Sequence, residues 1–245
     1  MAASIPECPW CSGTGWRTDE VQAAVVRCEC RIRTRDERAL AATHIPPRYF
    51  NCAFTNFDLY PERGGPRNES LWKAFGIVQR YLADFPLVDG KGLLLTGDTG
   101  VGKTHLIVAL LKGLIEKGAE GLFLDYQELL KRIQSSYEPT ALTAERHVMR
   151  PALEAEVLVM DDLGANRVSE WVEDTINYLL NHRYTEKKVT LLTANLSSER
   201  LGGAPGNRFT RPSFEERLGP RVASRLHEMG RIVEITAEDY RKRAR

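Results

Sequence analysis

Residues 97 to 104 read Gly97-Asp98-Thr99-Gly100-Val101-Gly102-Lys103-Thr104, and this stretch decides the fold. It follows the apolar run of residues 93–95 and opens a helical pattern. Glycines let backbone N–H groups turn inward onto phosphate oxygens, and the positive end of the following helix faces the same anion. The sequence therefore predicts a loop that holds the phosphates of a nucleotide, with His105 as the last residue of the binding segment.

Two side chains of this loop have separate predicted roles. Lys103 reaches the β- and γ-phosphates, and the Thr104 hydroxyl binds Mg²⁺. A chance glycine-rich turn between a strand and a helix is the alternative. The complete motif in its required strand–loop–helix context favours the phosphate site and predicts ATP and Mg²⁺ as ligands.

Strand and helix patterns alternate on both sides of the loop. Strands are expected at 92–96, 121–125, 157–160, 189–193 and 232–235. Helices are expected at 71–85, from the loop to 117, and at 126–135, 144–153, 170–184 and 214–228. Strands that alternate with helices indicate an α/β fold with a parallel sheet covered on both faces.

The strand expected at 157–160 ends in two carboxylates, Asp161 and Asp162. At a strand end beside the phosphate loop, Asp161 would lie in the Mg²⁺ shell, largely through water, and Asp162 would orient and deprotonate the attacking water. Alternatively, Asp162 caps the following turn, where aspartate is common. Asn195 follows the next strand; its amide either positions the lytic water and senses the γ-phosphate or forms an ordinary turn.

Two arginines in the last predicted helix are candidates for stabilising charge during hydrolysis. Arg221 and Arg225 are four residues apart, so they share one face of a helix. Phosphoryl transfer builds negative charge on the γ-phosphate, and an arginine from a neighbouring subunit can stabilise that charge. The alternative is a solvated basic helix face.

Four of the five cysteines stand near the N-terminus, as Cys8-x₂-Cys11 and, sixteen residues later, Cys28-x-Cys30. Four thiolates at short paired spacings suit a tetrahedral Zn²⁺ site. So short a segment has too little core to fold alone, so the metal would supply folding energy. A redox pair at Cys8 and Cys11, or unrelated free thiols, are the alternatives. Cys52 is expected to be a buried small hydrophobe.

Composition limits the class of protein. The chain has 245 residues and a net charge of +1, so its bulk charge requires no polyanionic partner. The first residues lack the charged segment and apolar run of a signal peptide, and no stretch is apolar enough to span a membrane. We therefore expect a cytoplasmic protein with no membrane partner, in which closely spaced cysteines indicate metal binding before disulfides.

The order of these motifs resembles the DnaC/DnaI type of bacterial helicase loader, within the AAA+ ATPases, and its IstB-like relatives. The similarity covers roughly residues 44–240. The matching segments are Ile45-Pro46-Pro47-Arg48-Tyr49, the phosphate loop, Leu158–Gly164, Asn181–Tyr184, Thr193–Leu196 and Leu218–Leu226. The phosphate loop alone is unspecific, but the whole set is specific, and Asp161-Asp162 fits the Asp-Asp-Leu-Gly pattern of this family.

The resemblance implies a five-stranded AAA+ core with little or no lid domain, which self-associates and hydrolyses ATP at subunit interfaces. It implies that Arg225 acts as a finger in a neighbouring site, with Arg221 as a second candidate or a phosphate sensor. Arg183 is expected to face a neighbouring subunit. Family members bind single-stranded DNA on the inner surface of the assembly. Unless the segment is an ordinary packed helix, the residues near DNA would be Tyr126, Lys131, Arg132 or the region of Arg167.

The chain is expected to divide into three parts. These are a zinc-binding module at 1–40, a linker at 41–70 and the AAA+ ATPase domain at 71–245. A zinc module before the ATPase core resembles that of DnaI-like loaders, which docks onto the hexameric replicative helicase. The residues that either touch helicase or DNA, or form a solvated helix start, are Arg31, Arg33, Arg35 and Arg38.

The expected function is an ATP-dependent helicase loader that binds the replicative helicase and delivers it to single-stranded DNA. A transposition helper ATPase of the IstB type, which engages a transposase and duplex DNA, is the alternative. A metabolic P-loop kinase is a third interpretation; it would need a pocket for an acceptor substrate and no arginine from a neighbour.

Overall fold

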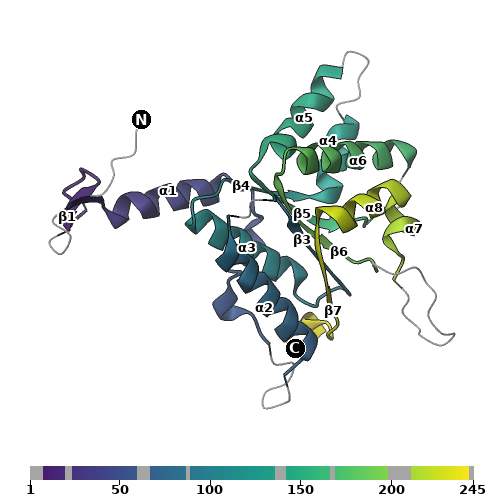
Figure 1. Ribbon diagram of the computed structural model, residues 1–245, viewed down its shortest axis with the longest axis horizontal. Coiled ribbons are helices and arrows are strands. Elements are labelled where there is room, and N and C mark those ends of the chain that lie inside the picture. Colours follow the sequence, from purple (N-terminus) through teal and green to yellow (C-terminus); the bar gives the residue numbers. More distant parts are fainter. Residues whose placement is uncertain are drawn as a thin grey trace.

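The computed structural model describes residues 8–19, 24–59, 67–86, 89–135, 142–165, 169–197 and 211–242. Its centre is a five-stranded parallel sheet with the strand order β4-β5-β6-β3-β7 (Figure 1). The strands are β3 (Gly92–Gly97), β4 (Gly121–Asp125), β5 (Val157–Leu163), β6 (Val189–Ala194) and β7 (Gly230–Ile235). The predicted α/β fold with a five-stranded parallel sheet is confirmed, and the phosphate loop follows β3, an interior strand.

Helices cover both faces of this sheet (Figure 1). One face carries α2 (Glu69–Asp84) and α3 (Lys103–Glu116). The other carries α4 (Tyr126–Ser135), α5 (Leu142–Glu154), α6 (Glu170–Thr185), α7 (Phe214–Leu218) and α8 (Pro220–Met229). Because successive strand residues point to opposite faces, Leu93 and Leu95 pack in the first core and Leu94 in the second.

The helix predicted at 214–228 is two helices, so the prediction of one continuous helix was wrong. Gly219 stands between α7 and α8 with a φ of 84°, and Pro220 is the first residue of α8. Proline lacks the N–H that a helix interior needs but suits its first turn. A Cβ on Gly219 would fall 2.3 Å from the Glu173 side chain of α6, so glycine also permits close packing here.

The N-terminal part forms a small module at the far end of α1, away from the sheet (Figure 1). Its antiparallel hairpin consists of β1 (Trp16–Asp19) and β2 (Ala24–Arg27). The helix α1 (Glu29–Ala41) starts directly after Cys28 and includes Cys30. Ala39 and Leu40, in its last turn, pack against the core beneath α3, so one helix joins the cysteine cluster to the ATPase core.

Short helical turns complete the fold. The connector contains η1 (Pro47–Tyr49) and η2 (Phe54–Asn56), and η3 (Tyr240–Lys242) follows β7. Across the described ranges, the helices are either too short or too polar to span a bilayer.

Candidate functional site

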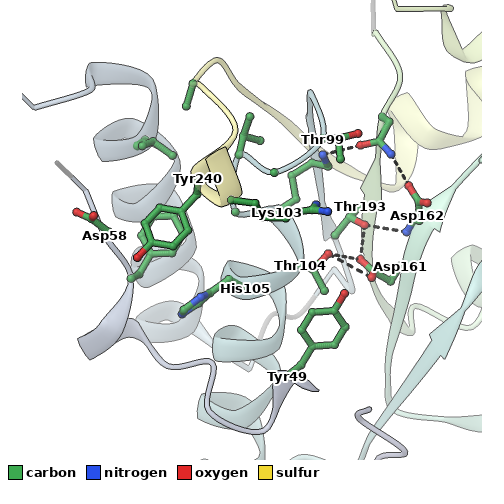
Figure 2. Close-up of a pocket in the computed structure, with 18 of the residues that line it drawn as sticks. Tyr49, Asp58, Thr99, Lys103, Thr104, His105, Asp161, Asp162, Thr193 and Tyr240 are labelled. Atoms are coloured by element: carbon green, nitrogen blue, oxygen red, sulfur yellow. Dashed lines mark hydrogen bonds between the residues drawn. The ribbon is translucent and has the colours of Figure 1, made fainter. Parts of the chain in front are cut away.

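The phosphate loop has the backbone geometry that its glycines permit. Gly100 and Gly102 have φ values of 82° and 97°, a region that side chains other than glycine rarely adopt. Gly102 precedes the first residue of α3, so the N-terminal end of that helix opens into a cavity of about 650 Å³ (Figure 2). The loop and strand-end residues that line it are Thr99, Gly100, Val101, Gly102, Lys103, Thr104, His105, Asp161, Asp162, Thr193 and Asn195.

Lys103 is buried at the base of this cavity. Its ammonium donates to the carbonyl oxygens of Gly97 at 2.9 Å and Asp98 at 2.7 Å, and to Asn195 Oδ1 at 2.7 Å. Burial lowers the pKa of Lys103 to about 8, although Asp162 and Asp161 oppose the shift. A cation held by uncharged carbonyls in a buried site would gain from an anionic partner, and this position therefore suits a phosphate.

Thr104 and Asp161 lie together as the Mg²⁺ prediction requires. Thr104 Oγ1 donates to Asp161 Oδ1 at 2.9 Å, and Thr193 Oγ1 donates to the same oxygen at 2.5 Å (Figure 2). Burial raises the pKa of Asp161 above its ordinary value, and the two threonine hydrogen bonds act against that rise. A hydroxyl and a buried carboxylate beside a phosphate loop are ligands that fit Mg²⁺.

Asp162 sits at the strand end in a strained conformation. Its φ is 58°, and its N–H donates to Thr193 Oγ1 at 2.9 Å. Asn195 Nδ2 donates to Asp162 Oδ1 at 2.6 Å, while Asn195 Oδ1 accepts from Lys103. A non-glycine residue held at positive φ costs energy that the surrounding structure must offset. The arrangement forms a hydrogen-bonded chain from Lys103 through Asn195 to Asp162.

The side chains of Asp98 and His105 already contact other parts of the protein. The Asp98 carboxylate lies 3.3 Å from Arg211 Nε, and Arg211 also pairs with Glu234 of β7. His105 Nε2 lies 2.9 Å from the carbonyl oxygen of Ala53. His105 therefore fastens the connector to α3, although its ring still borders the cavity.

Sequence reasoning did not assign a nucleotide role to several cavity residues. The connector contributes Arg48, Tyr49, Phe57 and Asp58, and the C-terminal segment contributes Tyr240 and Arg241. Arg48 and Tyr49 belong to the family motif at 45–49. The motif supported the resemblance, but no role in nucleotide binding was predicted for these two residues. Nothing in the local pattern around Tyr240 indicates that this residue returns to the phosphate loop, because only the tertiary fold brings the two together.

The two arginines of α8 lie outside this cavity among the described residues. The Arg225 guanidinium stacks 4.5 Å from the ring centre of Tyr184 and pairs with Glu228 at 2.5 Å. Arg221 is exposed and lies 3.5 Å from Asp174 of α6. Within one subunit neither arginine reaches the phosphate loop, so any contact with a nucleotide has to come from another copy of the chain.

Arg183 does not face a neighbouring subunit, and that expectation was wrong. Arg183 is fully buried, and its guanidinium donates to Thr190 Oγ1 and to several backbone carbonyl oxygens. These include the carbonyls of Ala152 and Ala155 at 2.8 Å and of Val189 at 2.6 Å. The negative end of α5 and the start of β6 therefore surround this cation, while burial lowers the pKa of Arg183 to about 9.

The residues suggested to lie near DNA have different surroundings. Tyr126 is fully buried in the second core, so a DNA contact by Tyr126 is ruled out and that expectation was wrong. Lys131 and Arg132 are exposed on α4, and Arg132 pairs with Glu128. Arg167 lies outside the described residues.

The four N-terminal cysteines gather at one point. All four sulfur atoms lie within 4.8 Å of one another, with Cys8–Cys28 at 3.7 Å and Cys11–Cys30 at 3.5 Å. Tetrahedral Zn–S bonds of about 2.3 Å place sulfur atoms about 3.8 Å apart, whereas a disulfide needs about 2.05 Å. The cluster therefore fits the predicted Zn²⁺, which would tie the turn that holds Cys8 and Cys11 to the start of α1.

One thiol of this cluster has a hydrogen-bond donor that stabilises its thiolate form. Cys11 Sγ accepts a hydrogen bond from the Gly15 N–H at 3.3 Å. Burial works against charge on Cys11, but the Gly15 N–H and the neighbouring thiols lower its pKa to about 6. The hydrogen bond to Cys11, together with burial, raises the pKa of Cys30 to about 12, so the thiolate of this pair is placed on Cys11. Cys52 is buried in the ATPase core, as predicted.

Replacing one cluster cysteine tests the zinc prediction. We expect Cys8→Ser to lose the stoichiometric Zn²⁺ that the unmodified chain keeps on dialysis, because structural Zn²⁺ binding is worth about 10–16 kcal/mol. The measurement is elemental analysis of the dialysed protein, supported by colorimetric zinc release on thiol modification. Cys52→Ala is the matched control and should keep its zinc; equal zinc contents in all three proteins would contradict the assignment.

The fold and the site together define a P-loop ATP-binding protein of the AAA+ class. The family model of IstB-like ATP-binding proteins matches residues 79–245. The chain belongs to this family, as the resemblance in its motifs indicated.

Solved structures and curated relatives agree with this membership. A crystal structure of the DnaC helicase loader has 31% identity and a TM-score of 0.60, covering 78% of this chain and all of that one. A DnaI crystal structure has 25% identity and a TM-score of 0.62, covering 79% and 96% of the two chains. Structures of the replication initiator DnaA, at 17–18% identity, share the fold alone.

Among the curated relatives, the uncharacterised protein YqaM of Bacillus subtilis is 28% identical over 84% of this chain and 61% of its own. The replicative helicase loader DnaI of Bacillus subtilis is 28% identical over 62% and 48% of the two chains. The replicative helicase loader DnaC of Escherichia coli K12 is 23% identical over 79% and 76%. This chain thus spans about half to three fifths of the length of the two Bacillus relatives.

Proposed function

We propose that this chain is an ATPase that loads the replicative DNA helicase onto single-stranded DNA. The observation that carries the proposal is the hydrogen-bonded chain from Lys103 through Asn195 to Asp162, beside the Thr104–Asp161 pair. It joins a phosphate-binding cation to a candidate base for hydrolysis. The helicase part of the proposal is supported by relatives and structures named as replicative helicase loaders.

In this proposal each residue of the site has a distinct task. Lys103 exchanges carbonyl partners for the β- and γ-phosphates, and Thr104 and Asp161 hold Mg²⁺, which would neutralise phosphate charge. Asp162 orients the attacking water and accepts its proton. Asn195, freed from Lys103 when the γ-phosphate binds, keeps its amide on Asp162 and so links phosphate binding to the orientation of the base.

The proposed assembly supplies the remaining charge. Arg225 from a neighbouring copy would stabilise the γ-phosphate, which requires it to leave Glu228, and Arg221 is the second candidate. Self-association would then depend on ATP. Release of DNA and helicase after hydrolysis requires that the assembled and dispersed states differ in ATP affinity, because a ligand shifts only what it binds unequally.

The zinc module is proposed to hold the helicase. It projects from the core on α1 (Figure 1) and exposes Trp10, Trp16 and Val25. Exposed aromatic side chains are typical anchors of protein interfaces. The domain division at 1–40, 41–70 and 71–245 stays part of this proposal, with α1 crossing its first boundary.

The proposal is tested with the full-length chain, the host replicative helicase and a fluorescent single-stranded oligonucleotide. We expect helicase to co-purify with the unmodified chain and the Cys52→Ala control, but not with Cys8→Ser or after treatment with a zinc chelator. Fluorescence anisotropy should show DNA binding with ATP that falls with ADP, and Lys103→Ala should abolish the ATP-dependent part.

Three results would contradict the proposal. Absence of nucleotide affinity in the unmodified chain would remove its basis. Filaments on duplex DNA with no helicase binding would favour a transposition helper of the IstB type. Phosphoryl transfer to a small molecule by an Arg225→Ala monomer would favour a kinase.

A further inference from the structure

The nucleotide cavity has two ends with different chemistry. Lys103, the Thr104–Asp161 pair and Asp162 gather the groups that suit the γ-phosphate and Mg²⁺. A nucleotide bound in this direction sends its ribose and base toward the opposite end. Figure 2 shows Tyr240 and Asp58 at that opposite end, across Lys103 from Asp161 and Asp162.

The C-terminal segment that carries Tyr240 rests directly on the phosphate loop. The Tyr240 N–H donates to the carbonyl oxygen of Gly100 at 3.0 Å. A Cβ on Gly100 would fall 1.7 Å from Asp239 Oδ1, so only glycine allows this approach. Asp239 in turn accepts from the Arg241 N–H at 3.1 Å, which fixes the short turn of η3.

Helix α2 holds the same segment from behind. The N–H of Thr236 donates to Ser70 Oγ at 2.8 Å, and Asn68 Nδ2 donates to the carbonyl oxygen of Thr236 at 3.2 Å. The backbone leading to Tyr240 is therefore attached both to α2 and to the phosphate loop. Such attachment places the ring with little loss of conformational freedom on binding.

The aromatic ring of Tyr240 is only partly covered by other side chains. The residue lines the cavity and is 51% exposed. Phe57 lines the same cavity, but its ring already packs on Phe75 at 5.8 Å and on His105 at 5.2 Å. An exposed ring at the base end of a nucleotide cavity suits stacking, which any nucleobase provides because every base has a π-face.

We propose that Tyr240 stacks on the base of the bound nucleotide, so that the C-terminal segment forms the base-side wall of the site. The inference rests on the proposed nucleotide binding and adds to it the residue that holds the base. Stacking does not distinguish one base from another, so Tyr240 contributes affinity for adenine and guanine nucleotides alike. The phenolic hydroxyl has no part in this role.

Calorimetric titration of the full-length chain with ADP, GDP and inorganic pyrophosphate, each with Mg²⁺, tests the proposal. Tyr240→Ala should weaken ADP and GDP binding by about 5-fold to 150-fold and leave pyrophosphate affinity unchanged. Tyr240→Phe should bind all three ligands as the unmodified chain does. Tyr178→Ala, which removes a similarly exposed tyrosine from α6, is the matched control and should change none of the affinities.

Two outcomes would overturn the inference alone. Unchanged ADP affinity in Tyr240→Ala would show that the ring does not contact the base. An equal loss of pyrophosphate affinity would show that Tyr240 only supports the phosphate loop through Gly100. If the unmodified chain binds neither ADP nor pyrophosphate, the proposed function fails as well, which separates the two failures.

Discussion

Asp162→Asn is expected to slow ATP hydrolysis by about 10²-fold to 10⁴-fold, the usual contribution of a positioned general base, while ATP still binds. The amide cannot accept the proton of the attacking water. Lys103 and the Thr104–Asp161 pair are untouched, so the phosphate and Mg²⁺ contacts remain. Steady-state phosphate release gives the rate, and equilibrium titration with a non-hydrolysable ATP analogue gives the affinity.

The substitution is chosen because it preserves the backbone. Asparagine tolerates the left-handed conformation that Asp162 adopts, and its side-chain oxygen can still accept from Asn195. Asp89→Asn, at an exposed carboxylate beside Lys91, is the control and should hydrolyse ATP normally. If Asp162→Asn hydrolysed ATP at the ordinary rate, Asp162 would not be the general base and would only cap the following turn.

Arg183→Met is expected to lower the free energy of unfolding by about 3–5 kcal/mol. Replacing both members of a buried ion pair by apolar side chains is often harmless. Here, however, the partners include backbone carbonyls at the end of α5, just after it and at the start of β6, which no substitution can remove. Each buried acceptor left without a donor costs about 1–3 kcal/mol. Urea unfolding followed by circular dichroism measures the change.

Arg150→Met provides the comparison for Arg183→Met. Arg150 is exposed on α5 and pairs with Glu154 at 2.8 Å, and a surface pair of this kind contributes about 0–1 kcal/mol. The control should therefore unfold close to the unmodified chain. If Arg183→Met were equally stable, the carbonyls around Arg183 would have to be satisfied without its guanidinium.

The sheet and the phosphate-binding half of the site could be predicted because their information is local. Residues 92–104 contain a buried strand, a glycine-rich loop and a helix start in one continuous segment. Asp161 and Asn195 could be placed beside it because parallel strands end at one edge of a sheet. The cysteine cluster could likewise be predicted from its spacing. Only a short hairpin separates the two cysteine pairs, so their four sulfur atoms can meet.

The remaining features depend on contacts between distant segments. The family resemblance and the position of Arg183 at the end of a predicted helix suggested a subunit interface, but only the packing of α5 against α6 shows that the partners of Arg183 are buried carbonyls. The break at Gly219 depends on how closely Glu173 of α6 approaches. Tyr240 contacts Gly100 although about 140 residues of sequence separate them, and no local sequence pattern predicts a contact between such distant residues.

The continuous helix α1 has a consequence for how the two ends of the molecule are oriented. A helix rises about 1.5 Å and turns about 100° per residue, so its length sets an angle as well as a separation. Inserting one alanine within the 13 residues of α1 would swing the cysteine module about a quarter turn around the axis while moving it little along it. A partner bound to the cysteine module would then face a different side of the ATPase core.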